Sequence, residues 1–238
     1  MAKPIWCVVP AAGAGLRAGG AVPKQYRNVL GKPLILRTME RLAQHPRVAG
    51  LVVALAERDR RWGGYVMCMG KPVRTCNGGA VRADSVRAGL ARLAQFERPD
   101  AWVLVHDAAR PCLPHADLDR LLREGTKHAV GALLAARIRD TVKRADDGES
   151  VAETVPREKL WRALTPQLFR LGELASALDW ARADPERAAR VTDESSAFEL
   201  LGKRPLLVEG SDDNLKVTTA DDLVRAEAIL ITQGERLA

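Results

Sequence analysis

Aromatic residues are scarce in this chain: they make up 4% of its 238 residues, whereas 47% of the residues are hydrophobic. The core must therefore be built mostly from Ala, Val and Leu. The net charge of +7 makes nucleic-acid binding conceivable. However, no stacking aromatics lie between the cations and no known nucleic-acid motif is present, so we expect no nucleic-acid partner. Small anionic substrates explain the positive charge equally well.

Cysteines and long apolar segments are also rare. The four cysteines form no Cys-x-x-Cys pair, and Cys7 lies in an apolar segment, so we expect neither a disulfide framework nor a structural zinc site. No stretch approaches the roughly 18 apolar residues of a membrane helix. Pro10 and Arg17 interrupt the only N-terminal segment that resembles a signal peptide. These absences predict a cytoplasmic protein with no membrane partner.

Short apolar runs recur along the chain, and stretches with helical spacing separate them. The runs cover 5–9, 51–55, 102–105 and 131–135. This alternation is typical of successive βαβ units. It predicts an α/β fold with a Rossmann-like, mostly parallel twisted sheet and helices on both faces. Thr219, followed by Asp222, is expected to cap a C-terminal helix. The length favours a single domain over residues 1–238.

Residues 137–160 break this alternation, because charged side chains crowd around an Asp-Gly turn between two short Val-containing segments. Such a pattern predicts a β-hairpin. A two-stranded hairpin is marginally stable alone. We therefore expect a protruding β-hairpin arm that packs on another surface, such as a second subunit.

A glycine-rich loop follows the first apolar run. Small residues let the backbone turn tightly and bring its N–H groups close to a ligand, and the cations Arg17 and Lys24 suit a polyphosphate. This loop lacks the Walker pattern, because no Gly-Lys pair in the chain is followed by Ser or Thr. The spacing of Gly13, Gly15 and Gly19 also fits a dinucleotide fingerprint poorly. The alternative is an ordinary strand-to-helix turn with solvated cations.

Three other segments carry candidate site residues. Asp107 follows the third apolar run, where ligands of open α/β sheets bind, and is a candidate for contact with a metal or ribose; the alternative is a helix cap or an ion pair with Arg110. The Gly78–Gly79 turn and Ser85 are candidates for contact with a base or ribose, or alternatively Asp84 or Ser85 caps a plain helix. Lys216 is a further candidate, although isolated lysines are mostly solvated.

Taken together, several motifs resemble one family. They are Pro-Ala-Ala-Gly-x-Gly-x-Arg with Pro-Lys-Gln-Tyr, Gly-Gly-x-x-Arg-x-x-Ser-Val, Val-His-Asp-Ala-Ala-Arg-Pro, Ala-Leu-Thr-Pro-Gln, Thr-Asp-Glu and Asn-x-Lys-Val-Thr. In this order and at these spacings they are similar to the 2-C-methyl-D-erythritol 4-phosphate cytidylyltransferases, from residue 5 to about residue 230. The resemblance implies transfer of a cytidylyl group from CTP to methylerythritol phosphate, with release of pyrophosphate, in non-mevalonate isoprenoid synthesis. It also implies a nucleotide-diphosphosugar transferase fold, Mg²⁺ or another divalent cation, and a homodimer through the arm.

The resemblance further implies residue roles. The catalytic cations would be Arg17, Lys24 and Lys216; the nucleotide contacts Ala11, Ala12, Gly13, Gly15, Gly78, Gly79, Ser85 and Asp107; and the substrate contacts Arg110, Thr141, Arg157, Thr165 and Thr192. Asp107 is the possible metal ligand, and otherwise the CTP phosphates would hold the ion. The arm would carry Thr141 and Arg157 to the other subunit.

The chain departs from the family pattern at Ala18, where Met is common, and at Ala80-Val81, where acidic residues are common. The second departure bears on how the cytosine is recognised.

Two other hypotheses for the function predict different behaviour. A ribitol-5-phosphate cytidylyltransferase would accept another polyol phosphate, and a non-catalytic nucleotide-binding protein of the same fold would bind CTP without turnover.

Overall fold

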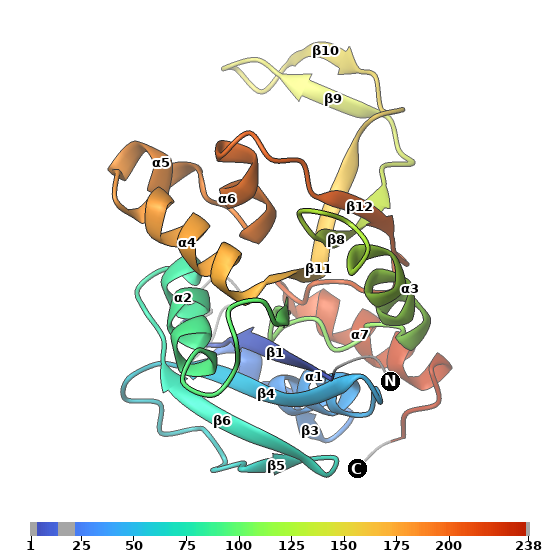
Figure 1. Ribbon diagram of the computed structural model, residues 1–238. Helices are drawn as coiled ribbons and strands as arrows, with labels where there is room; N and C mark the ends of the chain where they lie inside the picture. Colours follow the sequence, from blue (N-terminus) through green and yellow to red (C-terminus); the bar gives the residue numbers. More distant parts are fainter. Residues whose placement is uncertain (1–3, 14–21, 237–238) are drawn as a thin grey trace.

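The computed structural model describes residues 4–13 and 22–236, which form an eight-stranded sheet and the helices around it (Figure 1). The order of the strands across the sheet is β12-β8-β11-β7-β1-β4-β6-β5. In chain order these strands are β1 (Ile5–Pro10), β4 (Val48–Leu55), β5 (Met67–Cys68), β6 (Lys71–Asn77), β7 (Trp102–Val105), β8 (Ala132–Arg137), β11 (Trp161–Arg170) and β12 (Leu206–Glu209).

Most neighbouring strands in this sheet are parallel. β1 pairs in parallel with β4 and β7, and β4 with β6 and β8 with β12 do the same. The predicted α/β class with a mostly parallel sheet is therefore confirmed. β11 is antiparallel to both β7 and β8, and β5 is antiparallel to β6. β11 runs in the opposite direction to β8 because it returns from the arm that β8 leads into.

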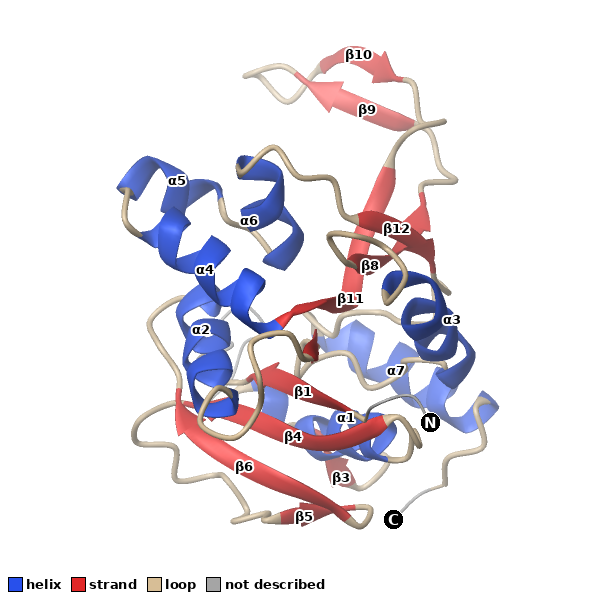
Figure 2. Cartoon of the chain, in the orientation of Figure 1, coloured by secondary structure: helices blue, strands red, loops and turns tan. Residues whose placement is uncertain are grey.

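Helices cover both faces of the sheet (Figure 2). They are α1 (Leu34–Ala43), α2 (Arg82–Leu93), α3 (His115–Gly125), α4 (Leu171–Arg182), α5 (Pro185–Arg190), α6 (Glu194–Leu200) and α7 (Ala220–Thr232), with a short 3-10 helix η2 (Lys24–Tyr26). Successive side chains of β1 point to opposite faces. Cys7 and Val9 pack with residues of α1 and α3, whereas Val8 packs with residues of α2 and α4.

The predicted C-terminal helix is confirmed as α7. The hydroxyl of Thr219 accepts a hydrogen bond from the backbone N–H of Asp222, and the Asp222 side chain accepts one from the backbone N–H of Thr219. Ala226 and Leu230 on this helix are buried in a small cluster that also contains Val217. α7 thus packs on the segment that carries Lys216, and the backbone N–H of Val217 in this segment donates to the carbonyl oxygen of Ala109, at 2.8 Å. Among the described helices, none has the length and apolar character needed to cross a membrane.

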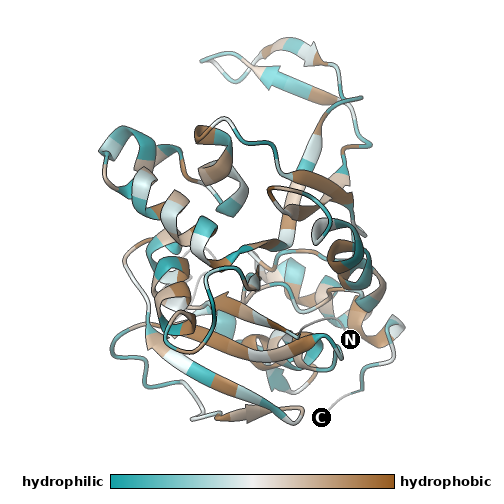
Figure 3. Cartoon of the chain, in the orientation of Figure 1, coloured by the Kyte–Doolittle hydropathy of each residue, from teal (hydrophilic) through white to brown (hydrophobic). Residues whose placement is uncertain are grey.

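The predicted hairpin arm is confirmed. β9 (Val142–Ala145) and β10 (Val151–Val155) pair antiparallel and stand away from the main sheet (Figure 1). A second small hairpin, β2 (Asn28–Val29) and β3 (Lys32–Pro33), lies beside α1. The arm is mainly hydrophilic (Figure 3), and the apolar side chain of Val151 is 64% exposed. Such an arm has almost no core of its own.

Candidate active site

A cavity of about 720 Å³ lies at the carboxyl ends of β1 and β7. Its walls come from the loop after β1, from η2, from the turn before α2, from the segment after β7 and from the segment before α7. Ligands of open α/β sheets bind at this edge. The cavity therefore lies where the candidate residues were expected to meet.

The loop after β1 is held by Gln25, a buried residue of η2. Its side-chain amide donates hydrogen bonds to the carbonyl oxygens of Ala11 and Gly13, at 2.9 and 3.0 Å. The backbone N–H of Ala11 donates to Ala54, at 2.8 Å. These bonds fix the start of the loop at the cavity wall. Its continuation, residues 14–21, lies outside the described residues.

Lys24 and Lys216 line the same cavity from different segments. The Lys24 ammonium donates a hydrogen bond to the carbonyl oxygen of Val217, at 3.3 Å. The Lys216 ammonium lies 2.8 Å from a carboxylate oxygen of Asp107. The 3-10 helix η2 thus holds one ammonium beside the segment that carries the other, although the two residues are far apart in sequence.

The turn before α2 lies tightly against the loop after β1. A Cβ atom added to Gly78 would lie 2.5 Å from the Cβ atom of Ala12, and one added to Gly79 would lie 2.2 Å from that of Asp84. Real Cβ atoms do not approach so closely, so these positions require glycine. The hydroxyl of Ser85 accepts a hydrogen bond from the backbone N–H of Gly79, at 3.1 Å. Gly78–Gly79 therefore lets two segments of the cavity wall come together.

Helix α2 begins at Arg82, after an extended Val81 that makes no side-chain cap. The alternative in which Asp84 or Ser85 caps this helix is therefore wrong, because both residues lie inside its first turn. Ser85 uses its hydroxyl on the preceding turn instead. The first N–H groups of an uncapped helix are donors for an anion, and this helix starts at the cavity wall.

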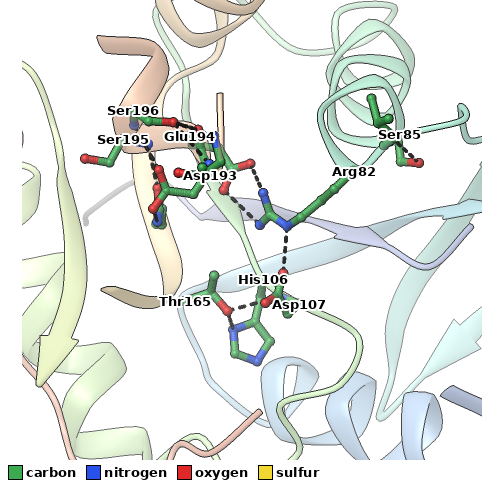
Figure 4. Close-up of polar contacts among 12 residues, drawn as sticks. Arg82, Ser85, His106, Asp107, Thr165, Asp193, Glu194, Ser195 and Ser196 are labelled. Atoms are coloured by element: carbon green, nitrogen blue, oxygen red, sulfur yellow. Dashed lines mark hydrogen bonds and ion pairs between the residues drawn. The ribbon is translucent and has the colours of Figure 1, made fainter. Parts of the chain in front are cut away.

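Three cationic side chains surround the carboxylate of Asp107. Figure 4 shows the contact with Arg82. Arg82 Nε lies 2.9 Å from Oδ1, and Lys216 Nζ and Arg110 Nε lie 2.8 and 3.5 Å from Oδ2. Burial alone would raise the pKa of Asp107, but the charges of Arg82, Lys216 and Arg110 outweigh it and hold that pKa well below its usual range. Asp107 is therefore an anion that holds cations at the cavity wall.

Arg82 joins Asp107 to a second carboxylate. Its Nη1 and Nη2 atoms donate to the two carboxylate oxygens of Glu194, at 2.6 and 3.0 Å (Figure 4). Burial lowers the pKa of Arg82, but the charges of Glu194 and Asp107 raise that pKa by a larger amount. The net shift is upward, so the guanidinium stays charged.

His106 and Thr165 lie beneath Asp107 and hold its backbone. The hydroxyl of Thr165 accepts a hydrogen bond from the Asp107 N–H and contacts Nδ1 of His106, each at 3.1 Å. Nε2 of His106 lies 3.0 Å from the carbonyl oxygen of Arg110. Burial lowers the pKa of His106 to about 4, so the ring is neutral at pH 7. Thr165 is 4% exposed, and its hydroxyl is used within the fold.

The predicted site residues thus fall into groups. Ala11, Ala12, Gly13, Lys24, Gly79, Ser85, Asp107 and Lys216 line the cavity, with Gly78 directly behind it. Arg110 and Thr165 are buried beneath Asp107. Thr192 lines a smaller neighbouring cavity of about 260 Å³. Thr141 and Arg157 are exposed in the arm region and do not line either cavity, and Gly15 and Arg17 lie outside the described residues.

Comparison with known proteins identifies the family. A model of the 2-C-methyl-D-erythritol 4-phosphate cytidylyltransferase family matches residues 5–232. The chain belongs to this family. It is 56% identical over 227 residues to the protein of that name from Xanthomonas campestris pv. campestris, covering 95% of this chain and 84% of the relative. It is 52% identical over 227 residues to the one from Xylella fastidiosa, covering 95% and 97%. The crystal structure of the Francisella tularensis protein aligns with a TM-score of 0.81 at 34% identity, covering 95% of this chain and all of that one.

Sequence reasoning overlooked two residues that are linked to Asp107, namely Arg82, which lines the cavity, and its partner Glu194. Arg82 stands in the Gly-Gly-x-x-Arg motif and Glu194 in the Thr-Asp-Glu motif, yet neither was assigned a role. Their pairing joins segments more than a hundred residues apart, so no local pattern could show it. The signal that was present is their position inside motifs shared with the family.

The donor set offers little to a metal ion. Among residues 4–13 and 22–236, no three His, Cys, Asp or Glu side chains gather in a group that could hold one. The carboxylate of Asp107 faces the cavity, but Arg82 and Lys216 occupy its two oxygens. A divalent cation here would depend on ligands supplied by the phosphates of a nucleotide.

Proposed function

We propose that this chain transfers a cytidylyl group from CTP to 2-C-methyl-D-erythritol 4-phosphate, which gives 4-diphosphocytidyl-2-C-methyl-D-erythritol and pyrophosphate in non-mevalonate isoprenoid synthesis. The observation that carries the proposal is the cavity in which Lys24, Lys216 and Asp107 meet, in a chain matched to the family over residues 5–232. A cytoplasmic location stays a prediction from the cysteine pattern.

The cavity suits a triphosphate. The Lys24 and Lys216 ammonium groups, the backbone beside Ala11–Gly13 and the uncapped start of α2 all place positive charge or N–H donors on its walls. In the proposed assignment Arg17 adds a further cation, and Gly78, Gly79 and Ser85 form the wall that meets the cytidine. Ala80-Val81 carries no carboxylate, so backbone groups of this turn would form the hydrogen bonds that recognise the cytosine base.

Electrostatic stabilisation is the main catalytic task. A phosphate oxygen of the acceptor attacks the α-phosphorus of CTP, a new P–O bond forms, and the bond to the β-phosphate oxygen breaks as pyrophosphate leaves. Both reactants are anions, so Lys24 and Lys216 lower their repulsion and stabilise the charge on the transferred phosphoryl oxygens. Asp107 holds the Lys216 ammonium in place. No covalent enzyme intermediate is needed.

The acceptor side is proposed to need two subunits. Arg110, Thr165 and Thr192 lie on the body of the chain, whereas Thr141 and Arg157 lie in the exposed arm region. A homodimer in which each arm reaches the partner's cavity would bring these groups together. It would also cover a hairpin that has little core of its own.

A divalent cation such as Mg²⁺ is proposed as the cofactor. When bound, it would neutralise part of the triphosphate charge. Asp107 is the candidate protein ligand, although Arg82 and Lys216 already occupy its oxygens. The phosphates would therefore supply most of the oxygens around the ion.

The deciding experiment is pyrophosphate release with Mg²⁺ and CTP, compared for methylerythritol 4-phosphate, ribitol 5-phosphate and no acceptor, with ATP, GTP and UTP as controls. We expect release only with CTP and methylerythritol phosphate. Release with ribitol phosphate instead would identify the other cytidylyltransferase. CTP binding without release under any condition would identify a non-catalytic protein.

A further inference from the structure

Arg82 commits three of its nitrogen atoms to two carboxylates. Nη1 and Nη2 donate hydrogen bonds to the carboxylate of Glu194, and Nε donates one to the carboxylate of Asp107. A guanidinium held in this way has one orientation, because its planar fork matches both oxygens of a carboxylate at once. Figure 4 shows the guanidinium lying between the two acids. The position of one carboxylate therefore determines where Arg82 meets the other.

Glu194 is itself rigidly placed. It is 1% exposed and is the first residue of α6, whose N-terminus is capped by Asp193. The Asp193 carboxylate also accepts a hydrogen bond from the side-chain amide of Gln167, at 2.9 Å, and Gln167 accepts one from the backbone N–H of Ser195, at 2.8 Å. Gln167 belongs to β11 and pairs with β7, the strand that leads to Asp107. The start of α6 is thus fixed to the central sheet.

A buried carboxylate is costly to maintain, and it persists where a partner compensates its charge. Glu194 compensates Arg82, which lies beside a cluster that already contains Lys216 and Arg110. Without the Glu194 charge, three cations would share Asp107 alone. Arg82 would then lose the paired contacts that fix its orientation at the wall of the cavity that it lines.

We propose that Glu194 is a positioning residue of the transfer site. It fixes Arg82 on Oδ1 of Asp107 and so leaves Oδ2 to Lys216 and Arg110, which keeps the Lys216 ammonium at the cavity wall. This proposal rests on the proposed function, because it assigns Lys216 to the reacting phosphate. Glu194 acts through Arg82, because Arg82 lines the cavity that contains Lys24 and Lys216 and Glu194 does not.

The expected effect lies in kcat. Glu194→Gln keeps the shape of the side chain but removes its charge, and Arg82→Lys keeps the charge but removes the fork. Each change displaces a charged group near the reacting atoms, and displacements of about 1 Å cost up to roughly 100-fold in rate. We expect kcat to fall about 10- to 100-fold in each variant, with the KM for CTP changed less than about threefold.

The double variant and a matched pair supply the controls. Since both residues act through one contact, the Arg82→Lys, Glu194→Gln variant should be no slower than the slower single variant. Arg87, on the same helix, forms a similar fork with Asp179, with both donor–acceptor distances at 2.7 Å, and neither residue lines either of the two cavities described above. Asp179→Asn should leave kcat unchanged. All values are expressed per CTP-binding site, so a loss of folded protein does not count as a loss of kcat.

Two results would overturn the proposal. One is a kcat for Glu194→Gln within twofold of the unaltered enzyme, per CTP-binding site. The other is a crystal structure of this variant in which Arg82 Nε remains in hydrogen-bond contact with Asp107 as before. If the unaltered enzyme releases no pyrophosphate with any acceptor, the proposed function fails. The crystal structure then still decides whether Glu194 positions Arg82.

Discussion

Replacing Lys216 by alanine separates the chemistry of the site from the stability of the fold. The Lys216 ammonium lies 2.8 Å from Asp107, but its side chain is 39% exposed. Asp107 keeps Arg82 at 2.9 Å and Arg110 at 3.5 Å, so its charge remains compensated after the change. Ion pairs this exposed contribute at most about 1 kcal/mol to stability. The free energy of unfolding should therefore fall by no more than that amount.

The effect on activity should be much larger. Removal of one preorganised electrostatic donor lowers turnover by roughly 10²- to 10³-fold, which corresponds to about 3–4 kcal/mol in the activation barrier. The barrier would thus change at least about three times as much as the stability. Because Lys216 is proposed to stabilise charge that develops as pyrophosphate leaves, most of the loss should appear in kcat.

The assay combines pyrophosphate release with urea unfolding of the same preparations. Lys24→Ala, at the other ammonium of the cavity, should show a similar loss of turnover. Lys203 forms an exposed pair with Glu173 at 3.1 Å, with side chains 44% and 43% exposed, and neither residue lines either of the two cavities described above. Lys203→Ala is therefore the matched control for the loss of a surface lysine pair. Unchanged turnover in both Lys24→Ala and Lys216→Ala would refute the electrostatic assignment.

Three further predictions concern the loops, the buried histidine and the arm. Gly78→Ala would place a Cβ atom 2.5 Å from that of Ala12, so we expect a stability loss of about 1–3 kcal/mol and a higher KM for CTP. The control is Gly148→Ala, whose new Cβ atom would have its nearest contact at 3.5 Å. An unchanged KM for CTP in Gly78→Ala would contradict the prediction. The pKa of His106 is lowered to about 4 by burial. Because the unfolded state binds a proton below about pH 6.5 and the native state does not, the free energy of unfolding should fall by up to about 3 kcal/mol between pH 6.5 and 4, and His106→Gln should flatten this dependence in urea titrations. Replacement of residues 142–155 by a short turn should give a monomer in sedimentation that binds CTP but turns over poorly, and a dimer of this variant would exclude the arm as the dimer contact.

Much of the fold could be predicted because its information is local. The apolar runs that became β1, β4, β7 and β8 are short, and the helical spacing of the stretches between them follows from helix geometry. β11 was not predicted as a strand, since polar residues such as Arg162 and Gln167 interrupt its apolar pattern. Its strand conformation depends on pairing with β7 and β8 on its two sides.

The site was predictable in its segments and less so in its contacts. Motifs placed Lys24, Asp107 and Lys216 at loops that converge on one edge of a parallel sheet, as sheet topology requires. Of the cations around Asp107, the sequence analysis considered Arg110 as an ion-pair partner, and the structure confirms that contact. The contact with Arg82 could not be derived, because Arg82 reaches Asp107 from another segment and depends on Glu194 for its orientation. Side-chain partners of this kind are set by tertiary packing.

The arm is where one chain gives the least information about function. Resemblance assigns substrate roles to Thr141 and Arg157, yet both are exposed and neither lines the cavity that contains Asp107. The hydrogen bond described for the Arg157 guanidinium goes to the nearby backbone carbonyl oxygen of Arg139. Among the described residues of one subunit, no side-chain partner of Arg157 is seen. A hairpin that exposes its apolar residues is marginal without a partner. In the proposed homodimer, the contact that would stabilise the arm is also the one that would complete the acceptor site, so dimerisation and turnover should be lost together.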